Sequence, residues 1–267
     1  MRSQRLDDGT ETDRRYTRAV SSSVVIILAA LFFVTAALYA SVGHAGASGY
    51  LAAMALLGVS PAIMKPTALA LNILVAAIAS LLYWRAGAFS WRTFWPFAVT
   101  SVPASFIGGR LVVPVRAYGI IVALILIYAA VRLLASRRGG EEQVTRVPTV
   151  AALMTGAIIG LLSGLVGVGG GIFLTPLLLF CRWSTTRVAM GVSAVFILVN
   201  SIAGLAGHAI GTGDLPRSLP ILAAAAAIGG WMGATYGSRR TNPILMRRLL
   251  AIVLVIASLK MFAAAAF

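Results

Sequence analysis

Long runs of apolar residues, separated by short polar or glycine-rich breaks, occupy nearly all of the chain after residue 20. A helix that crosses the hydrocarbon core of a bilayer needs about 20 predominantly apolar residues. Runs near that length predict membrane-spanning helices at residues 24–43, 63–84, 93–113, 117–135, 149–166, 188–208, 219–237 and 249–262. The pattern therefore predicts an all-α polytopic membrane protein with about eight transmembrane helices.

Two apolar segments, at residues 49–58 and 172–180, are too short to cross the bilayer as helices. Each follows a glycine-rich stretch, so each is expected to be a re-entrant segment or a half-helix. If both re-enter, the two halves of the chain run parallel; if both cross, the halves are inverted. The short length favours re-entry and parallel halves, with the inverted arrangement as the alternative. Basic residues flank the spans on both sides, so the positive-inside rule does not decide between them.

The second half of the chain repeats the first at a constant shift of 124 residues. Residues 70–81 fall on residues 194–205 with seven of the twelve positions identical, and the same register pairs Gly43 with Gly167 and Pro96 with Pro220. We interpret this as an internal duplication. Duplicated membrane proteins with interrupted hydrophobic segments at matching positions are typically secondary transporters.

Polar stretches set the expected boundaries of the duplicated units. Residues 1–20 form a polar tail of mixed charge, residues 21–135 the first transmembrane repeat, residues 136–147 a polar linker and residues 148–267 the second transmembrane repeat.

Composition excludes a soluble globular protein, because 60% of the residues are hydrophobic, 11% are charged, and the mean hydropathy is +0.94. The net charge is +15, but the basic residues are scattered at the ends of apolar runs. Basic residues at such positions usually face lipid headgroups or mark cytoplasmic loops. We therefore expect the lipid bilayer and a small substrate as partners, and no nucleic acid. The oligomeric state stays open.

The acidic residues all lie outside the apolar runs. Buried carboxylates are the usual means by which pumps and exchangers carry protons or cations, so an anionic or neutral substrate fits better. No nucleophile–base set, metal-spaced His/Cys cluster or phosphate loop is present in the sequence, so we expect no enzyme and no cofactor. The acidic residues are Asp7, Asp8, Glu11, Asp13, Glu141, Glu142 and Asp214.

The stretch 167–171 holds four glycines in five residues, which disfavours a helix interior and unwinds the chain. Unwound backbone at membrane depth is tolerated where it is buried in protein or lines a polar cavity. A helix that resumes after it points free amides and a positive dipole end at the break. We expect Gly167, Gly169, Gly170 and Gly171 to bind an anion through their amides; the alternative is a tight turn at the membrane surface.

The matching stretch of the first half contains Gly43, His44, Gly46 and Ser48. The His44 and Ser48 side chains are able to hydrogen-bond an oxyanion, so these four residues are predicted to line the opposite side of the site. The alternative for His44 is a wet residue at the membrane interface.

Three further polar residues lie in the apolar runs. Lys65 either balances substrate charge or snorkels to the headgroups. Asn72 and Asn200 lie in the duplicated helices and either join helices or line the substrate site, and we favour the site. Glycines at four-residue spacing from residue 156 to 164, and again at residues 229 and 233, are expected to serve close helix packing.

The segment 164–171, followed by Pro176, resembles the glycine-rich signature of the TauE/SafE family of sulfite exporters. The resemblance extends from about residue 24 to residue 262 and implies a multi-pass protein of the cell membrane, in bacteria the inner membrane, that moves sulfite or organosulfonates. The first half departs from the signature at His44, Ala45 and Ala47. The competing hypothesis is a membrane scaffold or assembly factor whose glycine motifs serve only helix packing.

Overall fold

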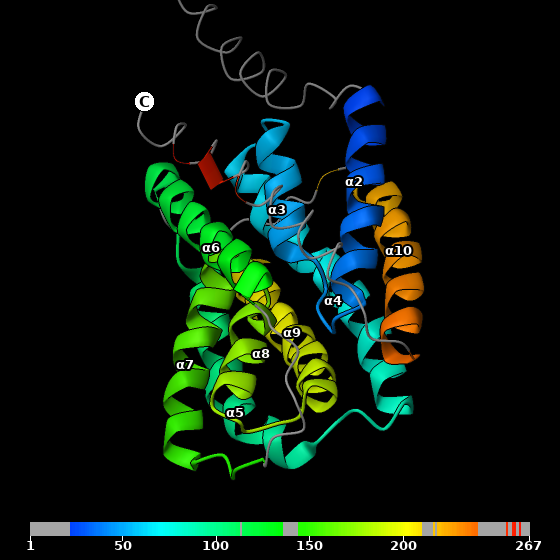
Figure 1. Cartoon of the computed structure of the whole chain (residues 1–267). Helices are drawn as coiled ribbons and strands as arrows, with labels where there is room; N and C mark the ends of the chain where they lie inside the picture. The colour runs from blue at the N-terminus through cyan, green and yellow to red at the C-terminus, as the bar shows by residue number, and fades with distance from the viewer. Residues whose placement is uncertain are drawn as a thin grey trace, which may run out of the picture.

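The computed structural model describes residues 22–112, 114–135, 144–209 and 218–239, with positions 216, 255, 258, 259 and 262. Within these residues the chain forms nine α-helices joined by short turns (Figure 1). In chain order they are α2 (Ser22–Ala40), α3 (Ala47–Leu56), α4 (Pro61–Arg85), α5 (Trp91–Arg110), α6 (Val115–Ala135), α7 (Thr149–Val166), α8 (Gly171–Phe180), α9 (Thr186–Ala209) and α10 (Leu219–Arg239).

Five of the described helices are long and apolar enough to cross a bilayer, namely α2, α4, α7, α9 and α10. Helices α5 and α6 cover the spans predicted at 93–113 and 117–135, but they are not among these five. The span predicted at 249–262 lies outside the described residues except at isolated positions, as do the tail 1–20 and most of the linker 136–147. The structure therefore supports a multi-pass helical membrane protein, without establishing the predicted number of eight spans.

Two interruptions of the helices coincide with the glycine-rich stretches. Between α2 and α3 the backbone is left-handed at Gly43 (φ 75°) and Gly46 (φ 99°), and between α7 and α8 it is left-handed at Gly167 (φ 90°) and Gly170 (φ 83°). Glycine adopts this conformation without the steric cost that other residues meet. The predicted unwinding of the chain at both glycine stretches is confirmed.

The 124-residue shift found in the sequence also relates the bounds of the two short helices and the conformations of the turns that follow them. The short helices α3 and α8 begin 124 residues apart and end 124 residues apart. The turn after α3 has a left-handed residue at Gly58 (φ 72°), and the turn after α8 has one at Arg182 (φ 55°), again 124 positions later. The two segments thus share both helix bounds and turn conformations.

Helices α2 and α3 form an antiparallel hairpin. Tyr39 near the end of α2 hydrogen-bonds Ser48 near the start of α3 at 2.6 Å, and the rings of Phe32 and Tyr50 lie 4.8 Å apart further along the hairpin. Figure 1 shows α3 turning back toward the end of the molecule at which α2 begins. The short helix therefore returns along its partner instead of continuing across.

The matched long helices α4 and α9 also run antiparallel. Leu69 near the start of α4 lies against Gly204 near the end of α9, whereas Tyr83 near the end of α4 contacts Met190 near the start of α9. The parallel arrangement of the halves, which the short segments favoured, does not hold for this pair. The reason is that α3 runs back along α2 as a pass of its own, so the described first half, α2 to α6, has an odd number of passes.

Glycine faces bring two further pairs of helices into backbone contact. The α7 glycines lie against the backbone of α5, and the α10 glycines lie against the backbone of α2, so a β-carbon at any of them would overlap the partner. This confirms the predicted close packing. The contacts are Gly156 with Phe97, Gly160 with Ser101, Gly164 with Ser105, Gly229 with Phe33, Gly233 with Ala37 and Gly237 with Ser41.

Candidate functional site

Both glycine-rich breaks lie against the α4–α9 pair. In the first break, Gly43 packs on the backbone of Met190 in α9. In the second break, a β-carbon at Gly167 would lie 3.1 Å from the carbonyl oxygen of Lys65 in α4. Elements far apart in the sequence therefore meet where the helices are interrupted.

His44 connects the first break to the start of α8. Its Nε2 lies 3.1 Å from the carbonyl oxygen of Gly171 and 3.3 Å from Oγ1 of Thr175, while its Nδ1 lies 3.0 Å from the carbonyl oxygen of Val42. The ring is half-buried and held at both nitrogens. His44 therefore joins the first break to the first residue of α8.

Thr175 extends this connection into α9, since its hydroxyl lies 2.6 Å from that of Ser193. Neither residue was among the predicted site residues. Thr175 directly precedes Pro176 of the glycine-rich signature. This position is the sequence feature from which a role for Thr175 in the site could have been predicted. The sequence does not distinguish a site role for Ser193 from helix packing, because a serine among alanines and glycines is consistent with either.

Asn72 of α4 and Ser201 of α9 converge on Gly169 in the second break. A β-carbon at Gly169 would lie 2.9 Å from Asn72 Nδ2 and 3.0 Å from Ser201 Oγ. Both side chains are 0% exposed, and neither has a hydrogen-bond partner in the described part of the chain. A buried polar group left without a partner costs about 1–3 kcal/mol, so two such groups at one glycine mark a place where a polar ligand would be stabilised. Ser201 was not predicted.

Asn200 is also fully buried, but part of its side chain serves its own helix. Its Nδ2 donates to the carbonyl oxygen of Phe196 at 2.8 Å, and its backbone carbonyl accepts from the Ser105 hydroxyl at 2.7 Å. Of the two polar atoms in the Asn200 side chain, Oδ1 alone has no partner among the described residues. Asn200 thus joins α9 to α5 through its backbone carbonyl, and its side chain retains one acceptor without a described partner.

The second break presents the amino-terminal end of α8 to these side chains. Gly170 caps the helix without a side-chain hydrogen bond, and the backbone bonds of the first turn start with the amides of Phe173 and Leu174, which donate to the Gly170 carbonyl at 3.0 and 3.1 Å. The preceding amides of Gly171 and Ile172 have no carbonyl within α8 to bond. The positive end of the helix dipole therefore faces the break.

The structure places Gly46 and Ser48 inside the α2–α3 hairpin. A β-carbon at Gly46 would lie 2.9 Å from the Tyr50 ring, and the Tyr50 hydroxyl donates to the Ala45 carbonyl at 2.7 Å. The Ser48 hydroxyl is engaged with that of Tyr39 at 2.6 Å. The first break is thus closed by its own aromatic side chains, and among its predicted residues His44 makes the contact with the second break.

Lys65 is 6% exposed, so it does not snorkel to the headgroups in this structure. Its Nζ donates to the carbonyl oxygens of Gly109 at 2.8 Å and Gly108 at 3.3 Å, in the last turn of α5. A cation at the carboxyl end of a helix is favoured by the helix dipole. Its ammonium group therefore stabilises the end of α5, while its backbone lies beside Gly167 of the second break.

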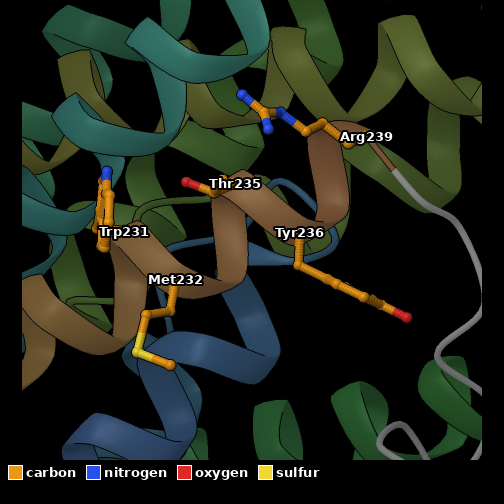
Figure 2. A pocket seen from close by; sticks show the side chains of 5 residues that line it. All are labelled: Trp231, Met232, Thr235, Tyr236 and Arg239. Carbon is orange, nitrogen blue, oxygen red and sulfur yellow. The ribbon is translucent and has the colours of Figure 1, made fainter.

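Two surface hollows lie away from the breaks. One, of about 430 Å³, is lined by α10 residues, and Figure 2 shows Tyr236 and Arg239 pointing in different directions from that helix. The other is lined by Trp84, Gly87, Phe89 and Trp91 between α4 and α5. Aromatic residues at helix ends are typical of the membrane interface. Over the part of the chain that the structure describes, no group of three His, Cys, Asp or Glu side chains is arranged to hold a metal ion.

Comparison with known proteins gives the family. The family model of the sulfite exporter TauE/SafE matches residues 27–261. The chain belongs to this family. The TauE/SafE chain is 44% identical over 238 residues to a probable membrane transporter protein of Sinorhizobium fredii, covering 88% of this chain and 96% of the relative. It is also 36% identical over 89 residues to a probable membrane transporter protein of Xylella fastidiosa, covering 33% of this chain and 34% of the relative. No solved structure matches it.

The family and its relatives support membrane transport as the general role of this TauE/SafE protein. The resemblance seen in the glycine-rich signature is confirmed. The names of the relatives specify neither a substrate nor a site.

Proposed function

We propose that the protein transports small anions, in particular sulfite or organosulfonates, and binds them at the glycine-rich breaks beside α4 and α9. The observation that carries the proposal is the convergence on Gly169 of two fully buried side chains, Asn72 and Ser201, that have no hydrogen-bond partner among the described residues. The proposed site comprises the amides of Gly169, Gly170 and Gly171 with these two side chains. The Gly167 amide, predicted from the sequence to join them, instead donates to the Ser163 carbonyl at 2.8 Å and ends α7.

The charge distribution supports an anion over a cation. All seven acidic residues fall outside the described part of the chain, so none of the described helices contributes a carboxylate. The α8 helix contributes a positive dipole end and free amides, which favour negative charge. A bound cation would meet this positive end without a compensating carboxylate from the described helices.

We further propose that the two halves are inverted repeats and that the substrate is reached alternately from the two membrane faces. The antiparallel course of α4 and α9 and the shared 124-residue shift of α3 and α8 support this arrangement. In transporters built from inverted repeats, the site lies where broken helices meet at the repeat interface. His44, which bonds the start of α8 from the first break, is suited to link the movements of the two halves.

We place this transporter in the cell membrane, as a multi-pass protein of the bacterial inner membrane. Under the competing scaffold hypothesis, every glycine motif serves packing alone. The α7 and α10 glycine faces do pack on α5 and α2. That hypothesis, however, gives no reason for burying Asn72 and Ser201 at Gly169 without partners in the described part of the chain. The transport hypothesis does give one.

The decisive experiment measures uptake and efflux of labelled sulfite and sulfoacetate by proteoliposomes that contain the purified protein. Gly169→Ala places a β-carbon against Asn72 and Ser201, whereas Gly58→Ala imposes a similar left-handed strain (φ 72° against 74°) with nothing within 4 Å. We expect saturable flux in the wild type and in Gly58→Ala, and at least a tenfold loss in Gly169→Ala. The loss has a steric cause, because even a single methyl group is felt in a packed site.

Saturable flux that is unchanged in a folded Gly169→Ala protein would move the site elsewhere. Absence of flux for every small anion tested, in protein with a normal unfolding transition, would favour the scaffold hypothesis.

A further inference from the structure

The polar atoms at the second break include an acceptor as well as donors. Asn72 is buried with neither Nδ2 nor Oδ1 hydrogen-bonded in the described structure, and the Ser201 hydroxyl beside it is equally unpaired. The carboxamide supplies two N–H donors at one end and a carbonyl acceptor at the other. Exchanging the positions of the carboxamide nitrogen and oxygen leaves the same numbers of unpaired donors and acceptors, whichever way the amide is placed.

An oxyanion without a proton would pair with the donors of this site but not with its acceptor. Its oxygens accept hydrogen bonds from Asn72 Nδ2, from the Ser201 hydroxyl and from the amides that open α8. Asn72 Oδ1 would then remain buried without a donor, close to the negative charge of the ligand. Leaving a buried acceptor unpaired costs about 1–3 kcal/mol, and a nearby anion adds repulsion.

We propose that the anion bound at Gly169 carries a hydrogen-bond donor of its own, which Asn72 Oδ1 accepts. This rests on the proposed function and specifies its substrate class: an oxyanion with one retained proton, or a sulfonate that bears a hydroxyl group. The charged oxygens of the anion accept hydrogen bonds from Asn72 Nδ2, from the Ser201 hydroxyl and from the α8 amides. The O–H of the anion donates to Asn72 Oδ1. A site that hydrogen-bonds a substrate hydroxyl strongly rejects an analogue that lacks it.

The test compares two permanently ionised sulfonates of nearly equal size, 2-hydroxyethanesulfonate and 1-propanesulfonate, which differ by a hydroxyl in place of a methyl group. Each is titrated against the purified protein, and its dissociation constant is obtained from the ligand-induced rise of the thermal midpoint. This readout does not require turnover. We expect 2-hydroxyethanesulfonate to bind at least tenfold more tightly to the wild type, as one satisfied buried acceptor implies.

Asn72→Leu removes both ends of the carboxamide at similar volume. The preference should fall below twofold, or binding of 2-hydroxyethanesulfonate should be lost altogether. Ser80→Ala is the matched control, since Ser80 is another buried α4 residue whose hydroxyl has no partner among the described residues and which is not placed in the site. It should retain the tenfold preference. If Asn72→Leu does not fold, Asn72→Ala serves the same comparison.

Equal binding of the two sulfonates, or binding of neither by a protein that transports sulfite, would overturn this inference and leave the proposed function standing. A tenfold preference that persists in Asn72→Leu would overturn the assignment to Asn72. Absence of sulfite flux together with absence of any anion-induced stabilisation would instead defeat the proposed function itself.

Discussion

The Nε2 atom of His44 lies 3.1 Å from the carbonyl oxygen of Gly171, although 127 residues separate them in the chain. The contact ties the break between α2 and α3 to the first residue of α8, and Thr175 adds a second bond to the same nitrogen at 3.3 Å. A single side chain thus connects segments from the two halves of the molecule.

His44 and Thr175 should therefore be energetically coupled. We expect the double variant His44→Ala/Thr175→Val to lose about 0.5–3 kcal/mol less unfolding free energy than the sum of the single variants, the range typical of residues in contact. Equilibrium unfolding in mixed micelles measures the cycle. Thr155→Val is the control partner for His44→Ala, because the Thr155 hydroxyl bonds the Ala151 carbonyl of its own helix. Additive losses for His44 and Thr175 would show that the two segments are not joined there.

Close packing of α5 and α7 should make Gly164 intolerant of the smallest side chain. A β-carbon at Gly164 would overlap the backbone carbonyl of Ser105, so Gly164→Ala must separate the helices and should cost about 1–3 kcal/mol. Ile158→Ala on the same helix is the control, because Ile158 is 59% exposed and makes fewer contacts to lose. Thermal midpoints of the purified variants decide the matter, and equal midpoints would contradict the packing.

Features encoded by local sequence were predicted well. The glycine stretches unwind the chain where expected, because left-handed backbone at Gly43, Gly46, Gly167 and Gly170 is a property of the residue type. The antiparallel course of α4 and α9 was not predictable in this way. It depends on α3 turning back along α2, and that hairpin is held by the contact of Tyr39 with Ser48, residues whose pairing no local pattern specifies.

The polar residues of the site were only partly predictable for the same reason. Asn72 stood out because an amide is conspicuous in an apolar run, and the structure brings it to Gly169. Ser201 was missed, because a small hydroxyl residue among alanines is equally consistent with helix packing. Ser48 was predicted to face the opposite break, but the structure pairs its hydroxyl with Tyr39.

Lys65 should contribute mainly to stability through its bonds to the end of α5. Lys65→Met leaves the buried carbonyls of Gly108 and Gly109 without the charged donor that now bonds them. Hydrogen bonds to charged groups contribute about 1.5–3 kcal/mol, so the unfolding free energy should fall by about that amount. Lys65→Arg keeps the charge and should recover part of the loss. An unchanged unfolding free energy with a raised half-saturation concentration for sulfite would show instead that Lys65 balances substrate charge.

Antiparallel α4 and α9 place their starting points at opposite ends of the pair. Ser60 precedes α4 and Cys181 lies shortly before α9, so the two residues should face opposite sides of the membrane. Cys181 is the chain's single cysteine and is half-buried, which makes it a natural reporter. In sealed vesicles, a membrane-impermeant maleimide should label Cys181 from one side only. A Ser60→Cys/Cys181→Ser double variant should be labelled only from the other side.

The labelling experiment separates the two repeat arrangements because Ser60 and Cys181 follow the matched short helices α3 and α8. In parallel repeats, the ends of these helices would emerge on the same face. In inverted repeats they emerge on opposite faces, which is what the antiparallel contacts of Leu69 with Gly204 and of Tyr83 with Met190 predict. Cys181→Ser alone must show no labelling, which controls for reaction at other groups. Labelling of both cysteines from the same side would overturn the inverted arrangement and, with it, the proposal that the two halves exchange access to one site.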